Sequence, residues 1–364
     1  MKIAYVASLG SRYFNGVLRK ITSQLATWNA IPGVEAQLFC RAPEGLNVPE
    51  GNVYRIKGTP TFSYSKSFIR DIRAYSPDVV YFRHEICGFQ AMELLRAFSG
   101  KIVMEVNSDL GAELKLEGER SLRRRLAYYF NKATSWYLER HLSGCVCISA
   151  AFLDFFPSVP RDRKIFIPNS IDLARNPVLK PATIVKPKRP CLLFMGTPNQ
   201  IWHGVDLLPP LARALPDCDF HIVGPEPIAG APSNMVFHGY QPQDKLANFY
   251  ARSHIGIGSL AFFRKNMNET NTLKVREYLA AGLPVIFAHN DSVFLQDPPP
   301  WALALEPREG LFEQPEAVAA VRRFIDMNAT HVVSHEECAP YIGAHIMETR
   351  KIEQLRRWFP DQAQ

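Results

Sequence analysis

Two glutamates, Glu269 and Glu277, stand eight residues apart in the sequence and could accept hydrogen bonds from the hydroxyl groups of a ligand. Glu277 lies in a helical pattern that ends at Gly282, and the apolar run at 285–287 predicts a strand. Glu269 lies in the polar loop before that helix. Because the free N–H groups of a helix start attract phosphate, these carboxylates predict a site for hydroxyls on both sides of a diphosphate, as in a nucleotide-sugar.

The start of this helix offers the candidate phosphate contacts. The backbone N–H groups of Asn271, Thr272 and Leu273 precede the first full turn. Lys274 lies in that turn and could add a charge-assisted hydrogen bond. A solvated lysine on a helix surface is the alternative, and the sequence leaves both open.

The spacing of the two carboxylates resembles the Glu-x7-Glu signature of retaining GT-B glycosyltransferases of the glycosyltransferase family 4 type. Further segments come in the order of that family: the Pro-Asn-Ser-Ile-Asp turn at 168–172, then 193–208, 220–224 and 236–240. The resemblance covers residues 165–290 well and the remainder in outline. Five pieces in order are more specific than any one of them.

The resemblance implies an α/β chain with the GT-B fold, in which two Rossmann-like domains face each other across a cleft. Alternating strand and helix signals along the whole chain independently favour α/β with parallel sheets. We expect an acceptor-binding domain at 1–175 and a donor-binding domain at 191–345. A proline- and lysine-rich linker at 176–190 separates them, and an amphipathic helix within 346–364 packs back on the first domain.

The same resemblance assigns roles to residues around the donor. It implies that Glu277 binds the ribose hydroxyls and that Glu269 acts at the donor sugar. Tyr240 would lie beside the nucleobase. Asn15 and Gly16 would form the first loop that approaches the donor, where only glycine lets a backbone come close. A simple turn at a helix start is the alternative for this pair.

The sequence departs from the family where the diphosphate is held. Relatives carry an arginine just after the glycine matched by Gly196 and a lysine before the glycine matched by Gly204. Here these positions hold Thr197 and His203. Stabilisation of the leaving group must then come from a protonated His203, from Lys274 or from the helix terminus, and the sequence does not choose among them.

Two residues after strands of the first domain are candidates for the acceptor side and the reaction centre. His84 follows the predicted strand 78–82, and Asn107 follows the strand 101–106. Many relatives carry a histidine near Asn107. Retaining transfer on one face of the sugar needs no protein base, because the leaving phosphate itself takes the acceptor proton. A packed core histidine is the alternative for His84.

Bulk properties exclude several classes. The 364 residues suffice for two domains, and the seven cysteines include no second Cys pair for a zinc site. No Asp-x-Asp cluster for a divalent ion is apparent, so we expect no metal and no cofactor other than the donor substrate. No apolar run approaches 18 residues, and the stretch 2–7 is too short for a signal core, so a cytoplasmic protein is expected.

The basic and aromatic stretch 120–140 leaves one partner open. It could lie on an anionic membrane surface, which would make the protein membrane-peripheral, or it could be a packed helix with a solvated basic edge. The positive charge is otherwise spread along the chain, so a nucleic-acid partner is not expected.

These observations predict a metal-independent, retaining hexosyltransferase. It would move a sugar from a nucleoside-diphosphate donor to a hydroxyl of a glycan or lipid-linked acceptor, in cell-surface polysaccharide synthesis. A non-catalytic sugar-nucleotide binding protein on the same scaffold is the alternative, favoured by Thr197 and His203 in place of the cations. A dehydrogenase is disfavoured, since no Gly-x-Gly-x-x-Gly follows either first strand.

Overall fold

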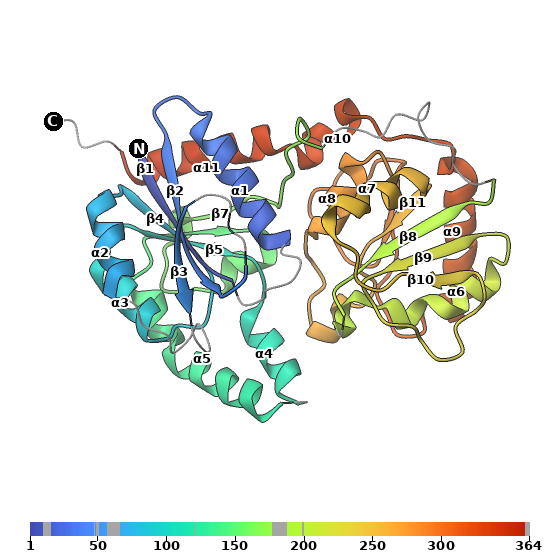
Figure 1. The fold of residues 1–364 in the computed structure, drawn as a ribbon, viewed down its shortest axis with the longest axis horizontal. Helices are drawn as coiled ribbons and strands as arrows, with labels where there is room; N and C mark the ends of the chain where they lie inside the picture. Colours follow the sequence, from blue (N-terminus) through green and yellow to red (C-terminus); the bar gives the residue numbers. More distant parts are fainter. Residues whose placement is uncertain are drawn as a thin grey trace. The chain divides into compact units, whose positions relative to one another are not determined.

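A computed structural model gives the structure of the chain. It describes residues 1–9, 16–46, 48, 51–56, 66–119, 121–176, 188–198 and 200–360. By its internal contacts the chain divides into two compact units (Figure 1). Unit 1 runs from Met1 to Pro168 and takes up the chain again at Ala344, and unit 2 runs from Asn169 to Gly343. The predicted domain boundaries were 175 and 345, and most of the predicted linker lies outside the described residues.

Unit 1 is a parallel α/β domain. Its described strands form a seven-stranded sheet in the order β3-β2-β1-β4-β5-β6-β7, and every neighbouring pair is parallel. The strands are β1 (Lys2–Ser8), β2 (Glu35–Pro43), β3 (Asn52–Ile56), β4 (Val79–Arg83), β5 (Ile102–Val106), β6 (Gly144–Cys147) and β7 (Lys164–Phe166). The central strands are apolar and buried on both faces, as parallel sheets covered by helices require.

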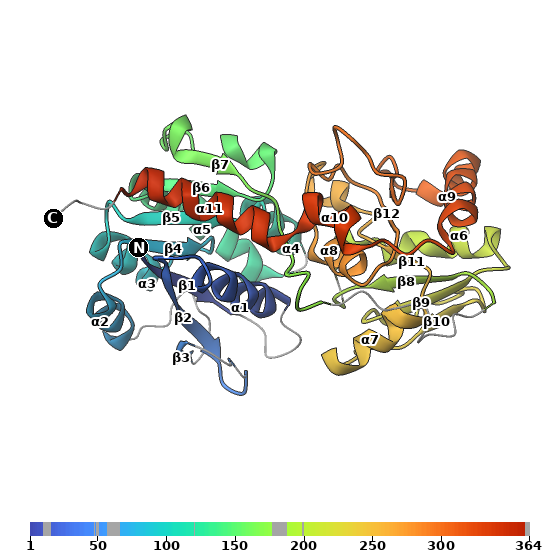
Figure 2. The same ribbon diagram turned by 90° about the horizontal axis from the view of Figure 1, so that it is seen from above.

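Helices from both ends of the chain cover this sheet. They are α1 (Gly16–Asn29), α2 (Lys66–Tyr75), α3 (Phe89–Ala97), α4 (Leu110–Gly118), α5 (Leu122–Arg140) and the last helix, α11 (Ala344–Trp358). Figures 1 and 2 show α11 beside α1, where Trp28 donates a hydrogen bond to Glu348 at 2.8 Å. The predicted return of the C-terminal helix to the first domain is therefore confirmed.

Unit 2 repeats the architecture with shorter strands. Its described strands form a parallel sheet in the order β10-β9-β8-β11-β12-β13. They are β8 (Cys191–Met195), β9 (Asp219–Val223), β10 (Met235–Phe237), β11 (Ile255–Ile257), β12 (Val285–Phe287) and β13 (Ala302–Ala304), and the helices are α6 (Leu208–Ala214), α7 (Gln243–Arg252), α8 (Leu273–Ala280), α9 (Pro315–Asn328) and α10 (His335–Ile342). The order reverses at β8, and ligands of open α/β sheets bind at the carboxyl ends of the strands near such a switch point.

Candidate active site

The loop before α8 is tied to the end of β12, and this fixes where the two glutamates lie. Thr270 N–H donates to the Asn290 carbonyl at 2.9 Å, and Asn290 N–H donates to the Asn268 carbonyl at 2.8 Å. Glu269 lies in this loop and Glu277 lies in α8, as predicted. The helix start lies between them, at the carboxyl edge of the sheet.

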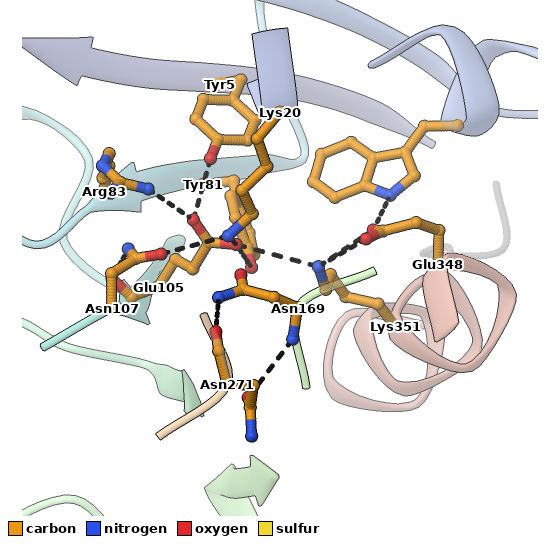
Figure 3. A network of polar contacts seen from close by, with 11 residues as sticks. Tyr5, Lys20, Tyr81, Arg83, Glu105, Asn107, Asn169, Asn271, Glu348 and Lys351 are labelled. Carbon is orange, nitrogen blue, oxygen red and sulfur yellow. Dashed lines mark hydrogen bonds and ion pairs between the residues drawn. The ribbon is translucent and has the colours of Figure 1, made fainter. Parts of the chain in front are cut away.

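A buried ion pair holds the loop from behind. Arg276 is fully buried and forms a two-pronged pair with Asp291, with Nη2 at 2.9 Å from Oδ1. Its Nε donates to the Asn169 carbonyl at 3.2 Å. The Asn169 amide donates to the Asn271 carbonyl at 2.7 Å (Figure 3), and the Asn271 amide donates to Ser292 Oγ at 2.8 Å. The Asn271 side chain therefore positions the loop, and a contact of its backbone N–H with the donor stays a prediction.

Two polar groups at the start of α8 have no hydrogen-bond partner among the described residues. Thr272 is the N-cap residue, but its side chain forms no capping bond and its Oγ1 is buried. The Lys274 ammonium is also buried, and it lies 4.7 Å from the centre of the Phe194 ring. Burial lowers the pKa of Lys274 to about 7. A buried ammonium without an anion is costly, so the start of α8 is a candidate site for an anionic ligand.

His203 lies against the turn after β8. The Thr197 N–H donates to its Nδ1 at 3.2 Å, so the proton of the neutral ring is on Nε2. A Cβ on Gly196 would come within 2.9 Å of Nδ1, which explains why glycine is needed there. Burial, followed by Lys274 and Lys265, lowers the pKa of His203 well below its ordinary value. In the protein without donor the ring is therefore neutral, and its Nε2–H offers one neutral hydrogen bond; its role at the diphosphate stays a prediction.

Sequence reasoning missed two polar residues at the ends of β11 and β12. His289 is buried, and its Nδ1 donates to the Ser259 carbonyl at 3.2 Å. Its Nε2 is then an acceptor, and neither it nor the buried Ser259 Oγ has a hydrogen-bond partner among the described residues. Burial, with smaller contributions from Arg276 and Lys274, lowers the pKa of His289 to about 4. A polar residue two positions after the end of a buried parallel strand was the available signal.

The remaining donor-side candidates are Glu277, Tyr240 and Leu273. Tyr250 on α7 donates a hydrogen bond to Glu277 Oε2 at 3.3 Å, so this carboxylate already receives a hydroxyl donor. Tyr240 follows β10, two strands from β8, and its side chain is 53% exposed. Leu273 begins α8. In unit 2 the Gly196–Thr197 turn, His203 and the start of α8 thus lie close together. Tyr240 lies two strands away from β8.

In unit 1 the candidate Asn107 belongs to a buried charge network (Figure 3). Its Oδ1 accepts from Lys20 at 3.1 Å, and its Nδ2 donates to the Glu105 carbonyl at 2.9 Å. Burial alone would raise the pKa of Glu105, but Lys20, Lys351 and Arg83 lower it well below its ordinary value. Lys20 donates to this carboxylate at 3.1 Å. The network fixes the orientation of the Asn107 amide, and its role in the reaction stays a prediction.

The other candidates of unit 1 are Asn15, Gly16 and His84. Gly16 begins α1, whereas Asn15 lies outside the described residues. The His84 ring meets Phe156 edge-on, with ring centres 5.6 Å apart. Burial, and to a smaller extent Arg83, lowers the pKa of His84 to about 4, so the ring is neutral. Its place on the acceptor side stays a prediction.

The fold is that of the GT-B glycosyltransferases. Sucrose-phosphate synthase from Thermosynechococcus elongatus superposes with a TM-score of 0.69 at 16% identity, over 98% of this chain and 99% of that chain. Anabaena HepE, solved with UDP-glucose, gives 0.64 at 14% identity over 98% and 100%. The lipopolysaccharide outer core galactosyltransferase WaaB gives 0.59 at 15% identity over 98% and 99%. At these identities the likeness shows the fold.

Sequence comparison adds a second finding. Residues 204–331 match a family model described as glycosyl transferase-like, and this segment contains both glutamates and the start of α8. No curated protein matches the sequence at a significant level. The second unit therefore has a glycosyltransferase-like sequence on a GT-B scaffold.

Proposed function

We propose that the chain is a retaining glycosyltransferase of the family 4 type, which transfers a hexose from a nucleoside-diphosphate donor to a hydroxyl of a glycan or lipid-linked acceptor. The observation that carries the proposal is the start of α8, where the Thr272 hydroxyl and the Lys274 ammonium are buried without a hydrogen-bond partner among the described residues. A helix terminus, a hydroxyl and a cation together match a diphosphate.

In this proposal each part of the donor contacts different groups of unit 2. The diphosphate binds the backbone N–H groups of α8, Thr272 and Lys274, and His203 donates one neutral hydrogen bond from Nε2. Glu277 accepts from the ribose hydroxyls, and Glu269 accepts from hydroxyls of the sugar. Lys274 thus supplies the charge that relatives place at the positions of Thr197 and His203.

The reaction follows from this placement. The bond between C1 of the sugar and the phosphate oxygen breaks, and the nucleoside diphosphate leaves with the bonding electrons. The acceptor hydroxyl attacks C1 from the same face, and its proton passes to the departing phosphate oxygen. The positive end of α8 and Lys274 stabilise the charge that develops on this oxygen. No protein base is required, and the Asn107 amide, which is bonded to Lys20 and to the Glu105 carbonyl, could not serve as one.

A direct assay tests the function. UDP-, GDP-, ADP- and dTDP-hexoses are screened by thermal shift, and each stabilising donor is then assayed for release of its nucleoside diphosphate. UDP-hexoses come first, because HepE was solved with UDP-glucose. Binding followed by release supports the transferase. Tight binding with no release, with or without saccharide or lipid-linked acceptors, would assign the chain to the alternative, a non-catalytic sugar-nucleotide binding protein.

Transfer is expected to persist in excess EDTA. The helix terminus and Lys274 supply the positive charge that a divalent ion supplies in other transferases. Among the described residues, no three His, Cys, Asp or Glu side chains gather as a metal site requires, but metal independence itself stays a prediction. Initial rates with EDTA, and with added Mg²⁺ or Mn²⁺, should agree within about twofold. Loss of activity in EDTA that either ion restores would contradict this account of the diphosphate site.

The proposal extends to the class of acceptor. WaaB, which has this fold, is a lipopolysaccharide outer core galactosyltransferase, and this supports a surface glycan as the acceptor. We place the present chain in cell-surface polysaccharide synthesis on the cytoplasmic side of the membrane, with a saccharide or lipid-linked acceptor bound by unit 1. Product analysis with a panel of short glycans would test this assignment.

A further inference from the structure

Helix α5 presents an apolar stripe to solvent. The side chains of Leu122, Leu126, Tyr129 and Trp136 are 69%, 62%, 61% and 56% exposed. Their spacings of four, three and seven residues place them on one face of the helix. The packed side of the helix is elsewhere, since Thr134 and Leu138 are the buried members of α5. We call these four exposed residues the α5 stripe.

Basic residues accompany the α5 stripe. The helix carries five of them, Arg123, Arg124, Arg125, Lys132 and Arg140, and a single acidic residue, Glu139. Glu139 already accepts a hydrogen bond from the Ser158 N–H. The Arg140 guanidinium lies over the Trp136 ring at 5.7 Å, so a cation stands directly at the stripe. A surface that combines apolar, aromatic and cationic groups in this way is complementary to the interface of an anionic bilayer.

We propose that the α5 stripe docks on the surface of a lipid bilayer that contains anionic lipid. Leucine, tyrosine and tryptophan side chains would enter the headgroup region, and Arg123, Arg125 and Lys132 beside the stripe would face the lipid phosphates, whereas Arg124 is paired with Glu117 of α4 at 3.0 Å. The helix lies on the membrane and does not cross it: no described helix is long and apolar enough to span a bilayer. Figure 1 shows α4 and α5 extending from the sheet of unit 1.

A second copy of the chain fits this face less well. Pairing two α5 helices through their stripes would bring the basic residues of both copies together with only one acidic residue on each helix. The net charge of +7 adds to this repulsion, whereas it adds to the attraction of an anionic surface. The docking proposal does not depend on the proposed transfer reaction, because it uses no residue of the candidate site.

Vesicle binding tests the proposal. Purified protein is sedimented with phosphatidylcholine vesicles with and without 50% phosphatidylglycerol, at low and high salt. We expect binding to the anionic vesicles only, weakened by salt. Replacement of Leu126→Gln with Trp136→Gln should weaken this binding by more than about tenfold. Replacement of Arg123→Gln with Lys132→Gln, on either flank of the stripe, should weaken it by roughly thirtyfold.

The control variant has the same change in net charge, but at two residues outside α5. Arg323→Gln with Arg357→Gln removes two exposed cations from α9 and α11, and should change vesicle binding by less than about twofold. Trp136 is far more exposed than the buried Trp28, Trp301 and Trp358, so quenching of its fluorescence by brominated lipid should disappear in Trp136→Phe. Equal loss of binding in the control and stripe variants would overturn the proposal.

Two other outcomes would also overturn it. One is equal binding to neutral and anionic vesicles, or to none. The other is a wild-type protein that does not bind vesicles and is a dimer by light scattering, with a Leu126→Gln variant that is monomeric. This result would mean that the α5 stripe binds a second copy of the chain. Circular dichroism and thermal unfolding of each variant establish that the fold is intact, because these side chains are exposed and their replacement removes little packing.

Discussion

Glu277→Ala is expected to lower the efficiency of transfer by about 10²–10⁴, with the fold intact. Each hydrogen bond from a ribose hydroxyl to the carboxylate contributes roughly 1.5–3 kcal/mol, so losing two costs roughly 3–6 kcal/mol. The side chain is partly exposed and accepts a 3.3 Å hydrogen bond from the Tyr250 hydroxyl, so the free energy of unfolding should change far less than the transfer efficiency. Steady-state kinetics against donor concentration measures the loss as kcat/KM.

The matched control for this variant is Glu353→Ala, which removes an exposed glutamate from α11. It changes net charge by the same amount and should leave kcat/KM within about twofold. Near-normal turnover of Glu277→Ala would remove Glu277 from the donor site. A loss shared equally by Glu353→Ala would point to the general charge of the protein and not to this site.

Lys274→Met is expected to act in opposite directions on stability and on transfer. In the wild type a buried ammonium has no hydrogen-bond partner among the described residues, and methionine fills a similar volume without a charge. Removing the cation should lower kcat by about 10²–10³, because it stabilises the leaving diphosphate. The donor-free variant should nevertheless unfold at a higher temperature than the wild type.

The gain in stability depends on pH with a definite sign. Unfolded Lys274 keeps its proton up to pH 10.5, and folded Lys274 releases it near pH 7. Between these values the unfolded chain binds more protons, so this residue makes the wild type more stable as pH rises. Lys274→Met should therefore exceed the wild type by about 3–5 kcal/mol at pH 6, less at pH 9. Denaturant unfolding at the two pH values measures this, and a variant less stable than the wild type at pH 6 would contradict the buried, unpaired ammonium.

Local pattern was enough to predict the elements that present the site. The helix 273–280, its stop at Gly282 and the strand after it follow from apolar spacing and from a glycine whose φ is +87°. The alternation of strands and helices predicted both parallel sheets, and the fold comparison confirms the GT-B architecture. These features depend on residues close together in the sequence.

Contacts between distant residues could not be predicted in the same way. The sequence pattern singled out Glu277 but not its neighbour Arg276, which is buried and pairs in the core with Asp291, fifteen residues away. The low pKa of His203 arises from burial and from Lys274, which is 71 residues further along the chain. Asn107 is bonded to Lys20 of another helix. Protonation and burial are properties of packing, so a single sequence leaves them open.

The central claim is that Lys274 and the start of α8 hold the donor diphosphate, and donor affinity as a function of pH tests it most directly. An intact nucleotide-sugar is the probe, because its diphosphate has no terminal phosphate group to titrate near neutral pH. His203 and His289 are neutral in this range, since burial lowers the pKa of each. Binding must then protonate Lys274, whose pKa in the free protein is about 7.

Isothermal titration from pH 6 to pH 9 should show a constant Kd below pH 7 and a roughly tenfold rise per pH unit above it. Lys274→Met should bind weakly with a Kd independent of pH. A wild-type Kd that is also independent of pH, or equal to that of Lys274→Met, would contradict the account.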